Sequence, residues 1–139
     1  MGKTVLTFGS FDPLHEGHLD MLAQARSLGE RLIVVVARDA VIRSQKRYEP
    51  FQSEIDRLQC VSAVAVVDQA VLGDMDPSSY GLLASLEFDV LAVGYDQKPD
   101  DADIYRHLVG LGKSEVAVAR LKPYRPEDFK SSFLRTGAQ

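Results

Sequence analysis

The sequence predicts an α/β fold, with a parallel sheet of about five strands and helices on both faces. Short apolar segments rich in β-branched residues alternate along the chain with amphipathic segments of helical period. Residues 31–38 are almost continuously apolar, as is typical of a strand covered on both faces. Because strand and helix alternate, the strands are expected to pair in parallel through helical connections.

Each element is predicted from its own local pattern. The expected strands are residues 4–8, 31–38, 69–72, 89–94 and 115–121. The expected helices are residues 17–28, 53–64, 77–86 and 101–111, with one more short helix in the tail at 125–137. Ser53 is a candidate N-cap, and Gly29 stands where a C-terminal glycine belongs. Gly81 weakens the prediction for the third helix.

Composition limits the classes of function. The 139 residues fit a single domain over 1–139, with 45% hydrophobic residues, 26% charged residues and a net charge of −4. The negative charge argues against nucleic acid or an anionic membrane as a partner. No leader or membrane span is expected, and one cysteine, Cys60, fits a cytoplasmic protein. We expect Cys60 to be buried as a small apolar residue.

The predicted sheet selects four places for a ligand. In parallel α/β sheets, ligands bind beyond the carboxyl ends of the strands. Here those places are residues 9–18, 38–47, 94–99 and the segment after 121. A cluster of basic residues, RSQKRY at 43–48, falls in the second of them and could hold a small anion.

The first of these places carries the most distinctive residues, FGSFDPLHEGH at 8–18. A helix that begins near His15 offers backbone N–H groups and a positive dipole end to an anion. His15 and His18 are three residues apart and therefore share a helix face. They are either phosphate-binding groups or polar residues at a helix start with no chemistry. Zinc is disfavoured, because Cys60 and His107 stand in no ligand spacing with this pair.

The same stretch resembles the signature G-[ST]-F-D-x-x-H-x-G-H of the cytidylyltransferase-like nucleotidyltransferase superfamily. Further segments resemble this superfamily in matching order, and they are VVVARD at 34–39, RL at 57–58, AVLGD at 70–74, VLAVGYDQ at 90–97 and SSFLR at 131–135. The sequence is most similar to the archaeal-type FAD synthase branch. The resemblance implies a Rossmann-like fold of the type that carries the paired histidines.

The resemblance also implies roles for individual residues. His15 and His18 would contact nucleotide phosphates and stabilise the charge of the transition state. The residues that would shape the nucleotide pocket are Gly9, Ser10, Phe11, Asp12 and Gly17. Lys46 would reach the phosphates, although Arg43 and Arg47 compete for this role and Lys46 is otherwise a solvated surface lysine.

Three further sets of residues follow from the resemblance. The GYDQ segment (Gly94, Tyr95, Asp96 and Gln97) would contact the base or ribose, or else form a capped turn. Ser131 and Ser132 would begin a helix and Arg135 would reach the β- and γ-phosphates, whereas a plain helix N-cap is the alternative. Phe133 departs from the small polar residue of many relatives. Arg57 either serves the site or pairs with a carboxylate on the surface of its helix.

The implied activity is transfer of AMP from ATP to the phosphate of FMN, which gives FAD and pyrophosphate. A divalent cation, Mg²⁺, would accompany ATP, and relatives of this kind are often homodimers. Two other acceptors stay open: glycerol 3-phosphate or a similar phosphorylated alcohol with CTP, and pantetheine phosphate with ATP. A nucleotide sensor without catalysis is the alternative from a different class of protein.

Overall fold

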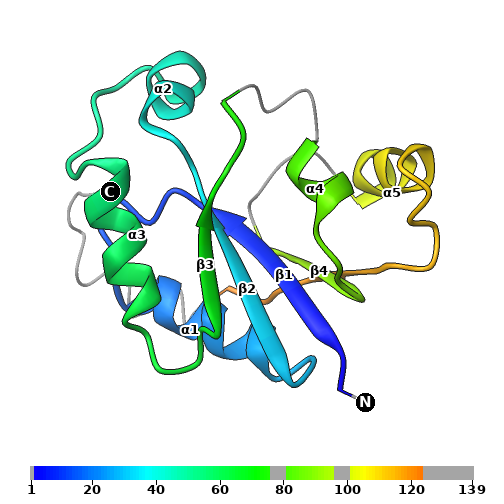
Figure 1. Ribbon diagram of the computed structural model, residues 1–139. Coiled ribbons are helices and arrows are strands. Elements are labelled where there is room, and N and C mark those ends of the chain that lie inside the picture. Colours follow the sequence, from blue (N-terminus) through cyan, green and yellow to red (C-terminus); the bar gives the residue numbers. More distant parts are fainter. Residues whose placement is uncertain (1, 76–80, 96–100, 124–139) are drawn as a thin grey trace.

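Five parallel strands form the centre of the protein (Figure 1). The computed structural model describes residues 2–75, 81–95 and 101–123. The strands are β1 (Thr4–Gly9), β2 (Arg31–Val36), β3 (Gln69–Leu72), β4 (Val90–Val93) and β5 (Ala117–Arg120). Their order in the sheet is β3-β2-β1-β4-β5. All four neighbouring pairs are parallel, so the predicted fold class and sheet are confirmed.

The strand order reverses direction at β1. The chain proceeds from β1 to β2 and β3 on one side, and then crosses to β4 and β5 on the other. In parallel sheets, ligands bind beyond the carboxyl ends of the strands at such a switch point, where the strand order reverses. The loop that carries the histidine pair starts at this switch point, because it follows β1.

Helices cover both faces of the sheet (Figure 1). The helices are α1 (Glu16–Arg26), α2 (Asp39–Val41), α3 (Glu54–Ser62), α4 (Gly81–Ser85) and α5 (Asp101–Gly110). Buried side chains of α1 and α3 pack on one face of the sheet. Buried side chains of α5, with partly buried ones of α4, pack on the other.

The two cores arise from the alternation of side chains along each strand. In β1, Val5 belongs to the core under α1 and α3, whereas Leu6 belongs to the core under α5. In β2, Val34 and Ile33 are divided between the same two cores. This arrangement explains the nearly continuous apolar run of β2, since both of its faces must be apolar to be buried.

The segment after β2, where no helix was predicted, is helical. It forms α2 and then one turn of π-helix, η1 (Ile42–Lys46), closed by a hydrogen bond of 3.2 Å from the Arg47 N–H to the Ile42 carbonyl. The π-helix is a rare element, and the few that occur are often found at functional sites. No apolar period in the sequence predicts this one. Residues 77–80 of the helix predicted at 77–86, and the whole of the tail helix expected at 125–137, lie outside the described residues.

Two smaller expectations were wrong. Cys60 is exposed rather than buried, because it lies on the solvent side of α3. Gly29 does not adopt the positive φ of a helix-ending glycine, and the C-cap of α1 is Ser27. Gly29 is instead required by close approach, since a Cβ there would lie 2.5 Å from the Lys3 carbonyl oxygen. Across the described part of the chain, no helix is long and apolar enough to cross a membrane.

Candidate active site

The turn after β1 is built around a buried aromatic ring. Phe11 has a φ of 54°, a left-handed conformation that costs energy in a residue with a side chain. This conformation places its ring in the core, where only 1% of the residue is exposed. Gly9 makes room for it, because a Cβ at Gly9 would lie 3.0 Å from two carbons of the ring. The glycine is therefore needed for packing within the turn.

The two histidines form a reciprocal cap at the start of α1. His15 is the N-cap, and its Nδ1 accepts a hydrogen bond of 3.0 Å from the Gly17 N–H. His18 returns the contact, since its Nδ1 accepts from the His15 N–H at 3.3 Å. Two of the backbone donors at this helix start are thus satisfied by imidazole rings, in the manner of a capping box.

This cap has a consequence for the chemistry of the rings. A neutral imidazole carries one proton, so an Nδ1 that accepts a hydrogen bond leaves that proton on Nε2. The His15 and His18 rings stack with centroids 3.8 Å apart, and the edge of Phe11 meets His18 at 5.1 Å. The stack holds both rings on one face of the helix start, as the i, i+3 spacing predicted. Both rings can thus donate through Nε2.

Asp12 fixes a second segment against this turn. Its two carboxylate oxygens accept from the N–H groups of Phe51 at 2.8 Å and Gln52 at 2.9 Å. The carboxylate that the sequence assigned to the nucleotide pocket therefore holds the chain entering α3. In the same segment the side-chain oxygen of Gln52 is buried and has no hydrogen-bond partner within the described residues.

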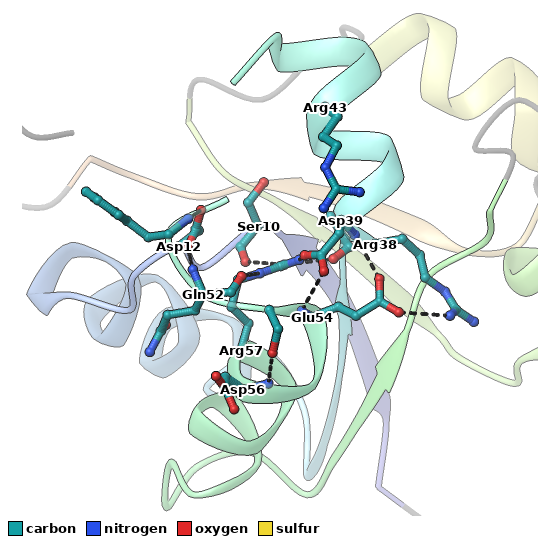
Figure 2. A network of polar contacts seen from close by, with 12 residues as sticks. Ser10, Asp12, Arg38, Asp39, Arg43, Gln52, Glu54, Asp56 and Arg57 are labelled. Atoms are coloured by element: carbon teal, nitrogen blue, oxygen red, sulfur yellow. Dashed lines mark hydrogen bonds and ion pairs between the residues drawn. The ribbon is translucent and has the colours of Figure 1, made fainter. Parts of the chain in front are cut away.

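Arg57 does not pair with a carboxylate on the surface of its own helix, which was one of the two alternatives drawn from the sequence. It is completely buried, and its carboxylate partner, Asp39, belongs to α2 rather than to its own helix. Figure 2 shows its guanidinium at the centre of a network of polar contacts. It donates four hydrogen bonds, to Gln52 O at 3.1 Å, Ser10 O at 3.0 Å, Ala37 O at 2.7 Å and Asp39 Oδ1 at 2.6 Å.

Asp39 and Glu54 join the starts of α2 and α3. The Asp39 N–H donates to Glu54 Oε1 at 2.8 Å, and the Glu54 N–H donates to Asp39 Oδ2 at 3.1 Å. Burial by itself would raise the pKa of Asp39. The hydrogen bonds from Arg57 and Glu54, with the positive charges of Arg57 and Arg43, outweigh burial and lower this pKa below its ordinary value.

The described side chains of the basic segment at 43–48 are exposed. Arg43 pairs with Glu49 at 3.0 Å, and this contact raises the pKa of Arg43 further above its ordinary value. Arg47 closes the π-turn with a φ of 65°, a strained conformation for a residue with a side chain. Lys46 is the last residue of η1. An open pocket of about 430 Å³ is lined by Arg43, Ser44, Arg47, Tyr48 and Glu49.

The end of β4 contributes the first half of the GYDQ segment. Gly94 follows the strand directly, and its carbonyl accepts a hydrogen bond of 2.7 Å from Arg120 at the end of β5. Tyr95 is 54% exposed. The remaining predicted site residues, Asp96, Gln97, Ser131, Ser132 and Arg135, lie outside the described residues.

The sheet brings together the predicted segments that the structure describes. Residues 9–18, 38–47 and 94–95 follow β1, β2 and β4, which are neighbours in the sheet. Sequence reasoning missed Arg120, Asp39 and the backbone of Gln52. Asp39 could have been found, since a carboxylate directly after a strand faces the same edge as the other candidates. The roles of Arg120 and Gln52 depend on contacts between distant segments, which no local pattern reveals.

The residues present can accommodate a divalent cation that arrives with a nucleotide. Mg²⁺ is usually held by substrate phosphates, water and one or two carboxylates. Within residues 2–75, 81–95 and 101–123, no group of three or more His, Cys, Asp or Glu side chains is placed to hold a metal ion.

Taken together, a helix start with paired donors at the switch point of a parallel sheet defines a nucleotide-binding α/β protein. A search of family models gives a match to the cytidylyltransferase-like family over residues 6–137. The chain belongs to this family.

Curated relatives and a solved structure agree with this membership. An FAD synthase of Korarchaeum cryptofilum is 41% identical, with 97% of this chain and 91% of that protein covered. An FAD synthase of Aciduliprofundum boonei is 38% identical, with coverage of 92% and 84%. A lipopolysaccharide core biosynthesis protein of Thermoplasma volcanium matches the fold with a TM-score of 0.82 and 35% identity, covering 89% of this chain and 99% of that one.

Proposed function

We propose that this protein is an FMN adenylyltransferase, which transfers AMP from ATP to the phosphate of FMN and releases FAD and pyrophosphate. The chemistry is supported above all by the histidine pair, whose reciprocal cap leaves the Nε2 protons as hydrogen-bond donors. The choice of ATP and FMN is supported by the relatives, several of which are FAD synthases that match most of this chain. The proposed nucleotidyltransferase domain spans residues 1–139.

The reaction needs no covalent enzyme intermediate. A phosphate oxygen of FMN attacks the α-phosphorus of ATP, a new P–O bond forms, and the bond to the bridging oxygen of pyrophosphate breaks. The FMN phosphate is already ionised, so no strong general base is required. Transfers of this kind depend mainly on positioning and on charge stabilisation. His15 and His18 would donate to oxygens that gain negative charge in the transition state.

Other residues have proposed roles in holding the substrates. Lys46 and Arg135 would neutralise the phosphates, and Ser131 and Ser132 would contact them. The proposed pocket for the nucleotide comprises Gly9, Ser10, Phe11, Asp12, Gly17, Gly94, Tyr95, Asp96 and Gln97. Asp12 would act through the chain entering α3, since its carboxylate oxygens bind the N–H groups there.

A divalent cation, Mg²⁺ in our proposal, would supply charge neutralisation of the triphosphate when bound. The nucleotide phosphates would carry most of its coordination. We further propose that the protein works in the cytoplasm, which the single cysteine supports. We also propose a homodimer, on the basis of the family resemblance. Analytical ultracentrifugation measures the oligomeric state.

One assay tests the proposed function. The protein is incubated with FMN, Mg²⁺ and either ATP or CTP, and FAD and pyrophosphate are quantified by chromatography and a coupled enzyme assay. The expected result is FAD and equimolar pyrophosphate with ATP. Product formed with CTP and glycerol 3-phosphate, or with ATP and pantetheine phosphate, but not with FMN, would replace the acceptor. No product with any pair would favour a nucleotide sensor.

A further inference from the structure

The buried arginine of α3, Arg57, has no part in the mechanism proposed above. Arginine is almost never fully buried unless it is paired, and Arg57 is 0% exposed. A guanidinium has five N–H donors, and four hydrogen bonds of Arg57 go to the protein itself. With its surface covered and its donors engaged in this way, Arg57 has no route to a substrate and can act only through its partners.

Those partners belong to three separate segments. The three carbonyl acceptors are Ser10 after β1, Ala37 after β2, and Gln52 before α3. The first two segments lead into the histidine pair and into the basic segment at 43–48. One rigid, planar group thus ties the turn of the histidines to the neighbouring strand end. The link is short, since each of the three contacts spans 3.1 Å or less.

Asp39 completes the link. It balances the charge of Arg57 through the contact of 2.6 Å, and its second oxygen accepts from the Glu54 N–H at the start of α3. The Glu54 carboxylate in turn accepts a hydrogen bond from the Asp39 N–H and forms an ion pair with Arg38 at 3.3 Å. The start of α2, from which the basic segment continues, is therefore held against α3 by the same group of charges (Figure 2).

We propose that Arg57 is a positioning residue for nucleotidyl transfer, which fixes the turn of the histidine pair relative to the segment after β2. This inference rests on the proposed function for its kinetic consequence only. The four acceptors are arranged around a planar fork, and the single ammonium of a lysine cannot reach all of them. Since a displacement of about 1 Å can cost roughly 100-fold in rate, loss of the fork is expected to lower kcat.

The test compares Arg57→Lys with the matched control Arg26→Lys. Arg26 also binds a carbonyl and a carboxylate, Gly29 O at 2.7 Å and Asp68 at 3.5 Å, but it does so at the amino-terminal edge of the sheet. Circular dichroism first shows that each variant is folded. We expect Arg57→Lys to lower kcat by roughly 10- to 100-fold with a smaller change in both KM values, and Arg26→Lys to resemble the wild type.

A second readout separates this inference from the proposed function. Amide hydrogen exchange does not require catalysis, and it reports how firmly each segment is held. In Arg57→Lys, amides of residues 10–18 and 37–39 should exchange faster than in the wild type, whereas those of β4 and β5 should not change. Asp39→Asn, which keeps the arginine, should accelerate exchange in the same segments. It provides the test of the positioning role if Arg57→Lys does not fold.

The outcomes are distinct. A wild-type protein that makes no FAD from ATP and FMN defeats the proposed function, and the exchange measurement still decides the inference. Unchanged exchange in residues 10–18 and 37–39 of the folded Arg57→Lys and Asp39→Asn variants overturns the positioning role. In an active enzyme, kcat of folded Arg57→Lys within twofold of the wild type, or an equal loss in Arg26→Lys, overturns it as well.

Discussion

The turn after β1 and the segment after β2 lie at neighbouring strand ends, yet they are built in opposite ways. In the turn, Phe11 is 1% exposed and both histidines cap the helix start. In the segment after β2, the side chains of the Arg43–Glu49 ion pair are 53% and 77% exposed. The turn is fixed by packing. The segment after β2 is fixed at its start by Asp39 and Arg57, but its exposed end at 43–49 is held by a contact that water weakens.

This difference matches the two tasks of a nucleotidyltransferase. Groups that stabilise a transition state work best when they are already in place, because no reorganisation is then needed during the reaction. Groups that grip a triphosphate must exchange one partner for another when the substrate arrives. An exposed ion pair between Arg43 and Glu49 can be replaced by an arginine–phosphate contact at little cost. We therefore expect changes in the turn to lower kcat and changes in the exposed segment to alter KM.

The largest effect is expected at His18. In His18→Asn, the amide oxygen can take the place of Nδ1 in the hydrogen bond from the His15 N–H, while the donor at Nε2 is lost. Turnover should fall about 100-fold or more, with the protein still folded. Steady-state kinetics and thermal unfolding measure the two quantities. His18→Gln is the matched variant, because its amide can replace the donor at Nε2 while the hydrogen bond from the His15 N–H is lost. Turnover near the wild-type value in folded His18→Asn would remove His18 from the mechanism.

Gly9 comes next, because it makes room for the ring below His18. In Gly9→Ala the new methyl group would lie 3.0 Å from carbons of Phe11, so the ring must shift and carry the edge contact with His18 along. We expect kcat to fall by roughly 10- to 100-fold. Gly110→Ala is the control, since a Cβ there meets nothing within 4 Å and alanine favours the helix. Wild-type kinetics in Gly9→Ala would mean that the turn tolerates movement.

Asp39 should make the free energy of unfolding depend on pH in the acidic range. Its pKa is lowered in the folded state, so its contribution is present above the unfolded-state value of about 3.9 and is lost as pH falls through the folded value. Asp39→Asn should be less stable than the wild type at neutral pH, and the difference should shrink as the pH falls below the unfolded-state pKa. Urea unfolding at several pH values measures it. A difference that stays constant with pH would contradict the coupling to Arg57.

The smallest effect is expected in the exposed segment. Glu49→Gln removes the partner that occupies Arg43, and it should lower the KM for ATP by a few fold with kcat unchanged. Arg43→Gln should raise this KM instead. Because the pair is exposed, neither change should shift the melting temperature appreciably. A fall in kcat without a change in KM in either variant would show that the segment belongs with the fixed part of the site.

Much of the fold could be predicted from the sequence, because it depends on local patterns. The run at 31–38 indicated a strand with two buried faces, and Val34 and Ile33 indeed enter different cores. Ser53 was predicted as an N-cap, and its hydroxyl accepts from the Asp56 N–H at 3.1 Å. The helical turns at 39–46 were missed, since no apolar period marks them and their first residue, Asp39, is fixed by hydrogen bonds with Glu54 of α3.

The candidate site was predictable only in part. The i, i+3 spacing predicted that His15 and His18 share a face, but not that each ring caps the helix through Nδ1. For Arg57 the sequence left two alternatives open, and the burial of its side chain excludes the ion pair on the surface of its helix. Its acceptors are up to 47 residues away in the chain, and only the folded sheet brings them to one point. Long-range contacts of this kind cannot be read from local spacing.

Single-turnover kinetics at saturating ATP test the division between the two regions most directly. The rate of FAD formation is measured with enzyme in excess over FMN, for His18→Asn and Arg43→Gln side by side. Saturation should restore Arg43→Gln to nearly the wild-type rate, because its defect lies in binding. It should leave His18→Asn slow by about 100-fold. The reverse pattern, with His18→Asn restored and Arg43→Gln slow, would contradict the account.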